Sequence, residues 1–293
     1  MSRPLDAVAT VVVVFLCLTW GFNQVAVKLA IPEIPPLIQA TIRSVGAAAI
    51  VALWMRMRGI SFTIRDGSLI PGLIAGFFFG LEFILLFRGL LWTTATRATL
   101  FLYLAPFFVV IGARWFLPVD RFHLSQWLGL GLSFAGMIVA FGLPTPAADP
   151  RQVIGDIMIV GGAATWAITT LVIKASALNR VAAEKTLLYQ LVVSGVMLGI
   201  AAAVFGETMT KMPGAVALGA LGYQTLWVVN ITYVLWFGLI ARYSASRLSA
   251  FTFLTPLFGV AAGYLVLDEP LTPAFAAAVA LVAAGLVLVN RRK

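Results

Sequence analysis

Long apolar stretches separated by short polar gaps run through the whole sequence. About 20 consecutive apolar residues cross the hydrocarbon core of a bilayer as an α-helix. By this measure the sequence predicts ten spans, at about residues 8–31, 35–55, 69–92, 97–117, 124–143, 153–174, 186–206, 214–240, 245–267 and 272–290. The gaps contain helix breakers such as Pro32, Pro118 and Pro144, and none of them is long enough to hold a soluble domain. The pattern predicts an all-α, polytopic membrane protein.

The composition points to the same class. The chain of 293 residues is 61% hydrophobic and only 11% charged, whereas a soluble domain is typically about a quarter charged. Much of the exterior must therefore contact membrane lipid. The net charge of +9 does not indicate a nucleic-acid partner, because the basic residues occupy short gaps rather than one face. The single cysteine, Cys17, excludes an internal disulfide framework and is expected to be a small buried residue.

Lys and Arg concentrate in every second gap. Positively charged residues stay on the cytoplasmic side of a bacterial inner membrane. If the N-terminus is cytoplasmic, fourteen of the twenty basic residues lie on that side: Arg3, Arg56, Arg58, Arg65, Arg114, Arg121, Lys174, Arg180, Lys185, Arg242, Arg247, Arg291, Arg292 and Lys293. The bias predicts a multi-pass inner-membrane protein with both termini in the cytoplasm.

Four short matches, in the same order in both halves, indicate an internal repeat. They pair Thr19-Trp20 with Thr165-Trp166, Gly89-Leu90 with Gly238-Leu239, Leu104-Ala105-Pro106 with Leu254-Thr255-Pro256, and Ala135-Gly136 with Ala284-Gly285. We therefore divide one membrane domain into two five-helix repeats, residues 1–147 and 148–293. Because five is odd, the second repeat must enter the membrane inverted. Inverted repeats let a transporter expose a midplane site to each side in turn.

Several motifs resemble one known family. Leu18-Thr19-Trp20-Gly21, the run Leu254-Thr255-Pro256-Leu257-Phe258-Gly259 and the turn Asp268-Glu269-Pro270-Leu271-Thr272 resemble the drug/metabolite transporter superfamily, in its EamA-like ten-helix branch. The first half carries Pro118-Val119-Asp120-Arg121 where this family usually has a Gly-Glu-Arg-like turn. The resemblance implies a secondary transporter that exports small metabolites. Bacterial aromatic amino acid exporters are similar, which implies amino acids as the substrate class.

Glu82 is the acidic residue nearest the middle of a predicted span. A charge inside the membrane is costly and is a functional candidate for that reason. Glu82 either forms an ion pair within the bundle, for which Arg43 is a better partner than Arg88, or serves transport directly. In the second case it couples protons or balances the ammonium group of a substrate.

Polar and aromatic side chains recur on several predicted spans. Polar groups in hydrocarbon need partners, so such residues face protein or water. On residues 214–240, helical spacing predicts one stripe that contains Tyr223, Trp227 and Asn230. An aromatic, weakly polar cavity suits a substrate with an apolar side chain and a charged end. The candidate substrate-binding residues are Trp20, Gln24, Phe79, Glu82, Phe83, Tyr103, Trp166, Thr169, Tyr223, Trp227 and Asn230.

Two repeat-related prolines, Pro106 and Pro256, fall near the middles of predicted spans. Proline removes a backbone hydrogen bond and bends a helix. Each position is either a hinge for transport or a static bend.

Other function classes lack their usual motifs. The only histidine, His123, has no titratable neighbour in sequence, so an intramembrane enzyme is disfavoured. No P-loop is present, which argues against direct use of ATP, and we expect no metal or cofactor. A channel would normally carry a filter or a charged pore motif, which is also missing. The remaining alternative to an amino-acid exporter is a carrier of the same fold for drugs or other metabolites.

Overall fold

The computed structural model describes residues 5–117, 122–143, 149–267 and 272–290. The motifs at 118–121 and 268–271 lie outside this part of the chain. The first half contains α1 (Ala7–Ala30), α2 (Pro36–Met57), α3 (Leu69–Gly89), α4 (Ala95–Leu102), α5 (Ala105–Phe116) and α6 (Leu124–Phe141). The second half contains α7 (Pro150–Ala175), the short η1 (Ala177–Asn179), α8 (Ala183–Val204), α9 (Ala215–Gly222), η2 (Tyr223–Thr232), α10 (Tyr233–Arg242), α11 (Ala245–Phe251), α12 (Leu254–Leu267) and α13 (Ala274–Asn290).

These elements confirm a polytopic helical membrane protein. Within the described ranges, nine helical segments are long and apolar enough to cross a bilayer. Three of them combine shorter elements, namely α4 with α5, α9 with η2 and α10, and α11 with α12. The tenth predicted span corresponds to α13, whose 17 described residues are at the lower limit of length for a crossing.

Two of the predicted continuous spans are broken rather than bent. The first break is at Tyr103 and Leu104, between α4 and α5, and the second is at Thr252 and Phe253, between α11 and α12. Pro106 lies in the first turn of α5, where proline is tolerated because its missing N–H would have no helical partner. The rings of Tyr103 and Phe253 pack against each other, with centroids 6.1 Å apart. The two breaks therefore meet inside the bundle.

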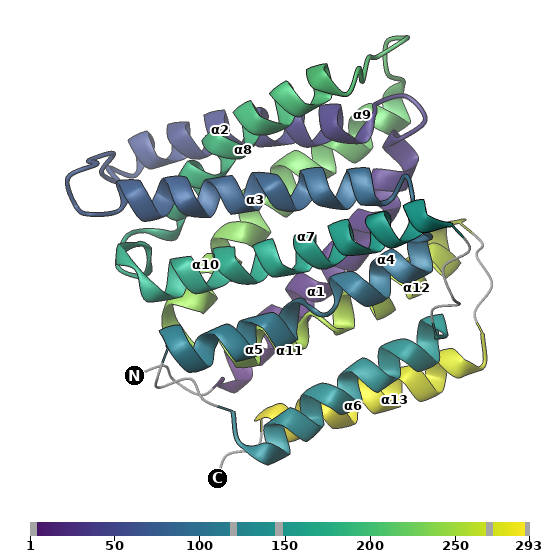
Figure 1. Cartoon of the computed structure of the whole chain (residues 1–293). Helices are drawn as coiled ribbons and strands as arrows, with labels where there is room; N and C mark the ends of the chain where they lie inside the picture. The colour runs from purple at the N-terminus through teal and green to yellow at the C-terminus, as the bar shows by residue number, and fades with distance from the viewer. Residues whose placement is uncertain (1–4, 118–121, 144–148, 268–271, 291–293) are drawn as a thin grey trace.

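The helices stack in an order that follows the repeat (Figure 1). The pair α2 and α8 forms one edge of the bundle, and the pair α6 and α13 forms the opposite edge. Each of these pairs joins an element to its predicted counterpart in the other half. Between the two edges, α3 packs on α7 while α1 packs on α9, η2 and α12. The chain enters α1 and leaves α13 at the same end of the bundle (Figure 1).

Two acidic residues fasten α2 and α8 to each other at opposite ends. Asp66, which follows α2, accepts from the Lys185 ammonium at the start of α8, at 2.5 Å. Glu207, which follows α8, accepts from the backbone N–H groups of Leu37 and Ile38 at the start of α2, at 2.9 and 3.2 Å. Hydrogen bonds from Lys185 and Ser68 lower the pKa of Asp66 from 3.8 to about 2. Both links are present in the same structure and join α2 and α8 at their two ends.

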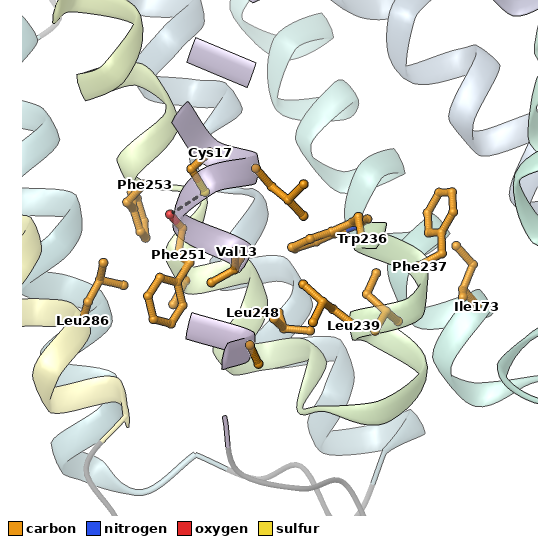
Figure 2. Packing of buried hydrophobic residues seen from close by; sticks show 14 of the residues in the cluster. Val13, Cys17, Ile173, Trp236, Phe237, Leu239, Leu248, Phe251, Phe253 and Leu286 are labelled. Atoms are coloured by element: carbon orange, nitrogen blue, oxygen red, sulfur yellow. Dashed lines mark hydrogen bonds between the residues drawn. The ribbon is translucent and has the colours of Figure 1, made fainter. Parts of the chain in front are cut away.

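The core is packed around the second break, between α11 and α12 (Figure 2). Phe251 and Phe253 are buried at the end of α11 and in the break, against α1. The Cys17 thiol donates to the carbonyl oxygen of Phe251 at 3.3 Å. Cys17 is free and buried, which confirms its predicted role as a small core residue.

Close contact between helices depends on glycine at a few positions. An added Cβ on Gly21 of α1 would lie 2.6 Å from Cβ of Phe258 and 2.7 Å from the backbone nitrogen of Gly259, both on α12. In lipid, helices associate largely through such small-residue packing. Gly131 on α6 is different, because none of the described atoms outside its own turn lies within 4 Å of an added Cβ.

We predict that Gly21→Ala destabilises the protein while Gly131→Ala does not. The new methyl at position 21 meets the backbone of α12, and such overpacking typically costs about 1–3 kcal/mol. The check is the thermal unfolding midpoint of both variants in the same detergent. Equal midpoints for Gly21→Ala and the wild type would show that α1 and α12 can separate freely.

Candidate functional site

A cavity of about 90 Å³ lies between α1, α3, α7, α8 and α10. Its walls are mainly aromatic, with a few polar groups. The lining residues are Trp20, Phe79, Glu82, Phe83, Trp166, Thr169, Thr170, Gln190, Tyr233, Trp236 and Phe237. Six of these were predicted from the sequence, namely Trp20, Phe79, Glu82, Phe83, Trp166 and Thr169.

The repeat-related tryptophans meet at one wall of this cavity. Trp20 of α1 contacts Trp236 edge-on at 5.3 Å between centroids, and Trp166 of α7 lies against the same ring at 6.1 Å. The indole N–H of Trp20 donates to Oγ1 of Thr232 at 2.8 Å, which fixes its orientation. Tyr233 packs edge-on against both Trp20 and Phe79. Rings from both halves of the chain thus form a single aromatic wall.

Polar groups from α7 and α8 complete the lining. The Thr169 hydroxyl donates to the carbonyl oxygen of Thr165, one turn earlier, at 3.0 Å. Gln190 is fully buried, and its amide Nε2 donates to the carbonyl oxygen of Thr186 at 3.1 Å. Its Oε1 has no hydrogen-bond partner among the described residues. Gln190 was not among the site residues predicted from the sequence, although an amide inside an apolar span is a signal that could have identified it.

Glu82 and Arg43 are both buried and do not form the ion pair that we considered. Glu82 is 9% exposed and Arg43 is 4% exposed. The Arg43 guanidinium lies over the Phe83 ring, 4.7 Å from its centroid. Within the described ranges, Oε2 of Glu82 and both Nε and Nη2 of Arg43 lack hydrogen-bond partners. Arg88, the other candidate partner, lies over the Phe205 ring instead.

Unmatched buried charges are energetically costly. Removing an ion from water costs several kcal/mol even after relaxation, and only good partner geometry offsets that cost. Such groups persist in a membrane protein where function requires them. The pair formed by Glu82 and Arg43 therefore marks this region as the candidate binding site.

Five predicted site residues do not line the cavity. Gln24 is exposed on α1, and Tyr103 packs against Phe253 at the helix break. The Tyr223 hydroxyl donates to the carbonyl oxygen of Thr19 at 3.1 Å. Trp227 is 39% exposed and contacts Phe15 edge-on. Asn230 donates through Nδ2 to the carbonyl oxygen of Thr225 at 2.7 Å.

The π-helix η2 explains why the predicted stripe at 223, 227 and 230 faces elsewhere. Hydrogen bonds in a π-helix join residues five apart, so its turn is wider than the 3.6 residues of an α-helix. Residues at α-helical spacing therefore do not stay on one face of such a segment. The cavity is lined instead by Tyr233, Trp236 and Phe237, which follow η2 on α10. Trp236 and Phe237 were not among the site residues predicted from the sequence.

A larger cavity of about 700 Å³ opens at one end of the bundle. It lies between the start of α1, the ends of α7 and α10, and the start of α8. We refer to it as the vestibule. Phe237 lines both the vestibule and the central cavity. Figure 2 shows its ring beside Ile173, another vestibule residue.

A buried ion pair lies toward the opposite end. Arg97 of α4 donates through Nε to both carboxylate oxygens of Asp156 on α7, at 3.1 Å, and also contacts it through Nη2. The Thr93 hydroxyl donates to the same carboxylate at 2.5 Å. Arg97 is 8% exposed and Asp156 is 7% exposed. Here, unlike at Glu82 and Arg43, both buried charges are matched.

The chain also matches known proteins. The EamA-like transporter family matches residues 8–142 and again residues 153–291. The chain belongs to this family. It is therefore a membrane transporter of the drug/metabolite transporter superfamily and not an enzyme. Among the described residues, no group of three or more His, Cys, Asp or Glu could hold a metal ion.

Individual relatives span almost the whole chain. The uncharacterized transporter YvbV of Bacillus subtilis (strain 168) is 26% identical over 95% of this chain and 90% of its own length. A probable amino-acid metabolite efflux pump of Escherichia coli (strain K12) is 25% identical over 93% of this chain and 90% of its own length. One crystal structure has a TM-score of 0.83 at 19% identity, over 97% of this chain and 96% of that chain. That similarity shows a shared fold.

We predict that Phe237→Ala joins the vestibule to the central cavity. The readout is the labelling rate of a cysteine at position 169, in a Cys17→Ala background, with a small thiol reagent. The rate should rise several-fold in Phe237→Ala, because the variant removes the ring that lines both spaces. Phe116→Ala, which removes an exposed ring on α5, is the matched control and should leave the rate unchanged. An unchanged rate in Phe237→Ala would show that the two spaces are separated elsewhere.

Proposed function

We propose that this protein is a secondary transporter that exports amino acids, including aromatic and other apolar ones, from the bacterial cytoplasm. The observation that carries the proposal is the central cavity. Its aromatic walls suit an apolar side chain, and its buried carboxylate suits an ammonium group. A relative in Escherichia coli named as a probable amino-acid metabolite efflux pump supports the same substrate class.

Transport by alternating access between two inverted halves is the second part of the proposal. The family matches the chain twice, over segments of similar length. Each half contributes one tryptophan to the wall around Trp236, and each half contributes one broken span. Two equivalent halves of opposite orientation supply two equivalent ways to close the site. Pro106 and Pro256, beside the breaks, are the proposed hinges.

The two ends of the bundle differ in a way that supports this cycle. Thr94 caps α4 by accepting from the Arg97 N–H at 3.3 Å, and Ser244 caps α11 by accepting from the Arg247 N–H at 3.1 Å. Arg97 and Arg247 are thus counterparts in the two repeats. Arg97 is paired with Asp156, whereas no ion pair to Arg247 is found in the described part of the chain. One end therefore carries a buried ion pair at this position, and its counterpart in the other repeat does not.

The concentration of Lys and Arg supports an orientation of the bundle in the membrane. Arg180, Lys185 and Arg242 lie on or next to the elements around the vestibule. By the positive-inside rule, the vestibule end faces the cytoplasm. The described conformation is then the one that loads substrate from the cytoplasm, as export requires.

Counterflow in proteoliposomes tests the substrate class. We predict saturable counterflow of labelled amino acids, with tryptophan, threonine and lysine as the first panel. Trp166→Ala should reduce tryptophan counterflow at least tenfold, because the aromatic wall loses a ring. Trp115→Ala, which removes an exposed tryptophan on α5, is the control and should retain counterflow.

Three outcomes are informative. Equal loss in Trp166→Ala and Trp115→Ala would mean that the central cavity is not the transport site. Counterflow without saturation would indicate a channel. No counterflow of any amino acid would overturn the substrate class, and drugs or other metabolites would then be the class to test.

The lock at the outer end generates a separate prediction. In right-side-out vesicles, a cysteine at position 169, in a Cys17→Ala background, should react slowly with an impermeant maleimide. Asp156→Asn should speed this reaction several-fold, because Arg97 loses its anionic partner. Arg151→Gln, which changes an exposed cation near the start of α7, is the control. If Asp156→Asn leaves the rate unchanged, the ion pair does not close the outer end.

A further inference from the structure

We infer that Glu82 and Arg43 bind the two opposite charges of a zwitterion, the ammonium at Glu82 and the carboxylate at Arg43. The inference rests on the proposed function and specifies it. The substrates are free α-amino acids with both groups unmodified, rather than amines, carboxylic acids or neutral drugs.

The side of the cavity near Glu82 offers hydrogen-bond acceptors. Glu82 of α3 and Gln190 of α8 both line the cavity. Oε2 of Glu82 and Oε1 of Gln190 are buried, and neither has a partner among the described residues. An ammonium group carries three donors and no acceptor, so it matches two converging acceptors. The Thr169 and Thr170 side chains on α7 line the same cavity.

Arg43 offers donors. Its guanidinium packs on Phe83, whose ring is also part of the cavity wall. Arg43 itself is not one of the lining residues. Nε and Nη2 are buried and lack partners in the described ranges. A guanidinium presents donors in a planar fork that fits a carboxylate in two-point fashion.

The charge balance selects for a zwitterion. With the site empty, the Glu82 carboxyl and the Arg43 guanidinium are both buried, and no ion pair joins them among the described residues. A zwitterion between them pairs both charges and adds no net charge. An amine would pair Glu82 and leave Arg43 unmatched, whereas a carboxylic acid would do the reverse. Leaving one buried charge unmatched typically weakens binding by about 30-fold or more.

The test uses matched analogues of one substrate. The amino acid with the strongest counterflow is compared with its decarboxylated amine and its deaminated acid as inhibitors. For tryptophan these are tryptamine and indole-3-propionate. We expect both analogues to inhibit wild-type counterflow about 30-fold more weakly than the parent amino acid.

Two variants separate recognition from a merely structural role. Glu82→Gln should weaken inhibition by the amino acid and by the amine but not by the acid analogue. The preference for the amino acid over the acid analogue therefore becomes smaller. Arg43→Gln should instead reduce the preference for the amino acid over the amine, and Arg43→Lys should restore part of that preference. Arg88→Gln changes a cation that stacks on Phe205, which is not a lining residue, and should change neither preference. A structural defect would weaken inhibition by all three ligands equally.

The possible failures are distinguishable. If wild-type counterflow is inhibited equally by the amino acid, the amine and the acid, the zwitterion site is wrong while the amino-acid carrier stands. Equal weakening of inhibition by all three ligands in both variants would also overturn the zwitterion site. If no amino acid shows counterflow, the proposed function itself fails, and the zwitterion site falls with it.

Discussion

The hydrocarbon core of the membrane cannot hydrate a charge, and this constraint organises the protein. Every buried charge must find a partner inside the bundle or carry a large cost. The pair of Arg97 and Asp156 obeys the rule, with Thr93 as a third member. Glu82 and Arg43 do not, although both are more than nine-tenths buried. The exception lies at the cavity where the two halves of the chain meet, which is why we assign recognition to it.

The same constraint explains where irregular backbone occurs. A broken helix exposes backbone groups that lipid cannot satisfy, so breaks belong in the protein interior. The breaks at Tyr103 and Phe253 meet in the core, where their rings pack against each other. The edge pairs, α2 with α8 and α6 with α13, contain unbroken helices. The two helix breaks thus lie at the centre, between two edges of unbroken helices.

Much of the fold follows from the sequence because one physical rule governs it. Apolar runs of bilayer length predicted the spans to within a few residues, and the family comparison confirmed the class of protein. The sequence also found six of the lining residues, among them Trp20 and Trp166, because the repeat pointed to them. The orientation in the membrane and the inversion of the second half stay predictions.

The remaining site residues depend on backbone geometry that a pattern of period 3.6 does not contain. The π-helix η2 turned Trp227 toward the exterior and placed Trp236 at the cavity. Gln190 and Arg43 are single polar residues in apolar runs, and only packing reveals that neither is fully partnered. Whether Glu82 and Arg43 pair is decided by distances between helices, which the sequence of one chain does not record.

Alternating access between the two halves is the central claim, and paired distance measurements test it most directly. Spin labels at Val8 and Ala175 report on the vestibule end, and labels at their repeat counterparts Ile154 and Leu29 report on the opposite end. All four positions are exposed. In vesicles that perform counterflow, substrate should change the two distances in opposite directions. Two distances that stay fixed, or that change in the same direction, would contradict alternating access.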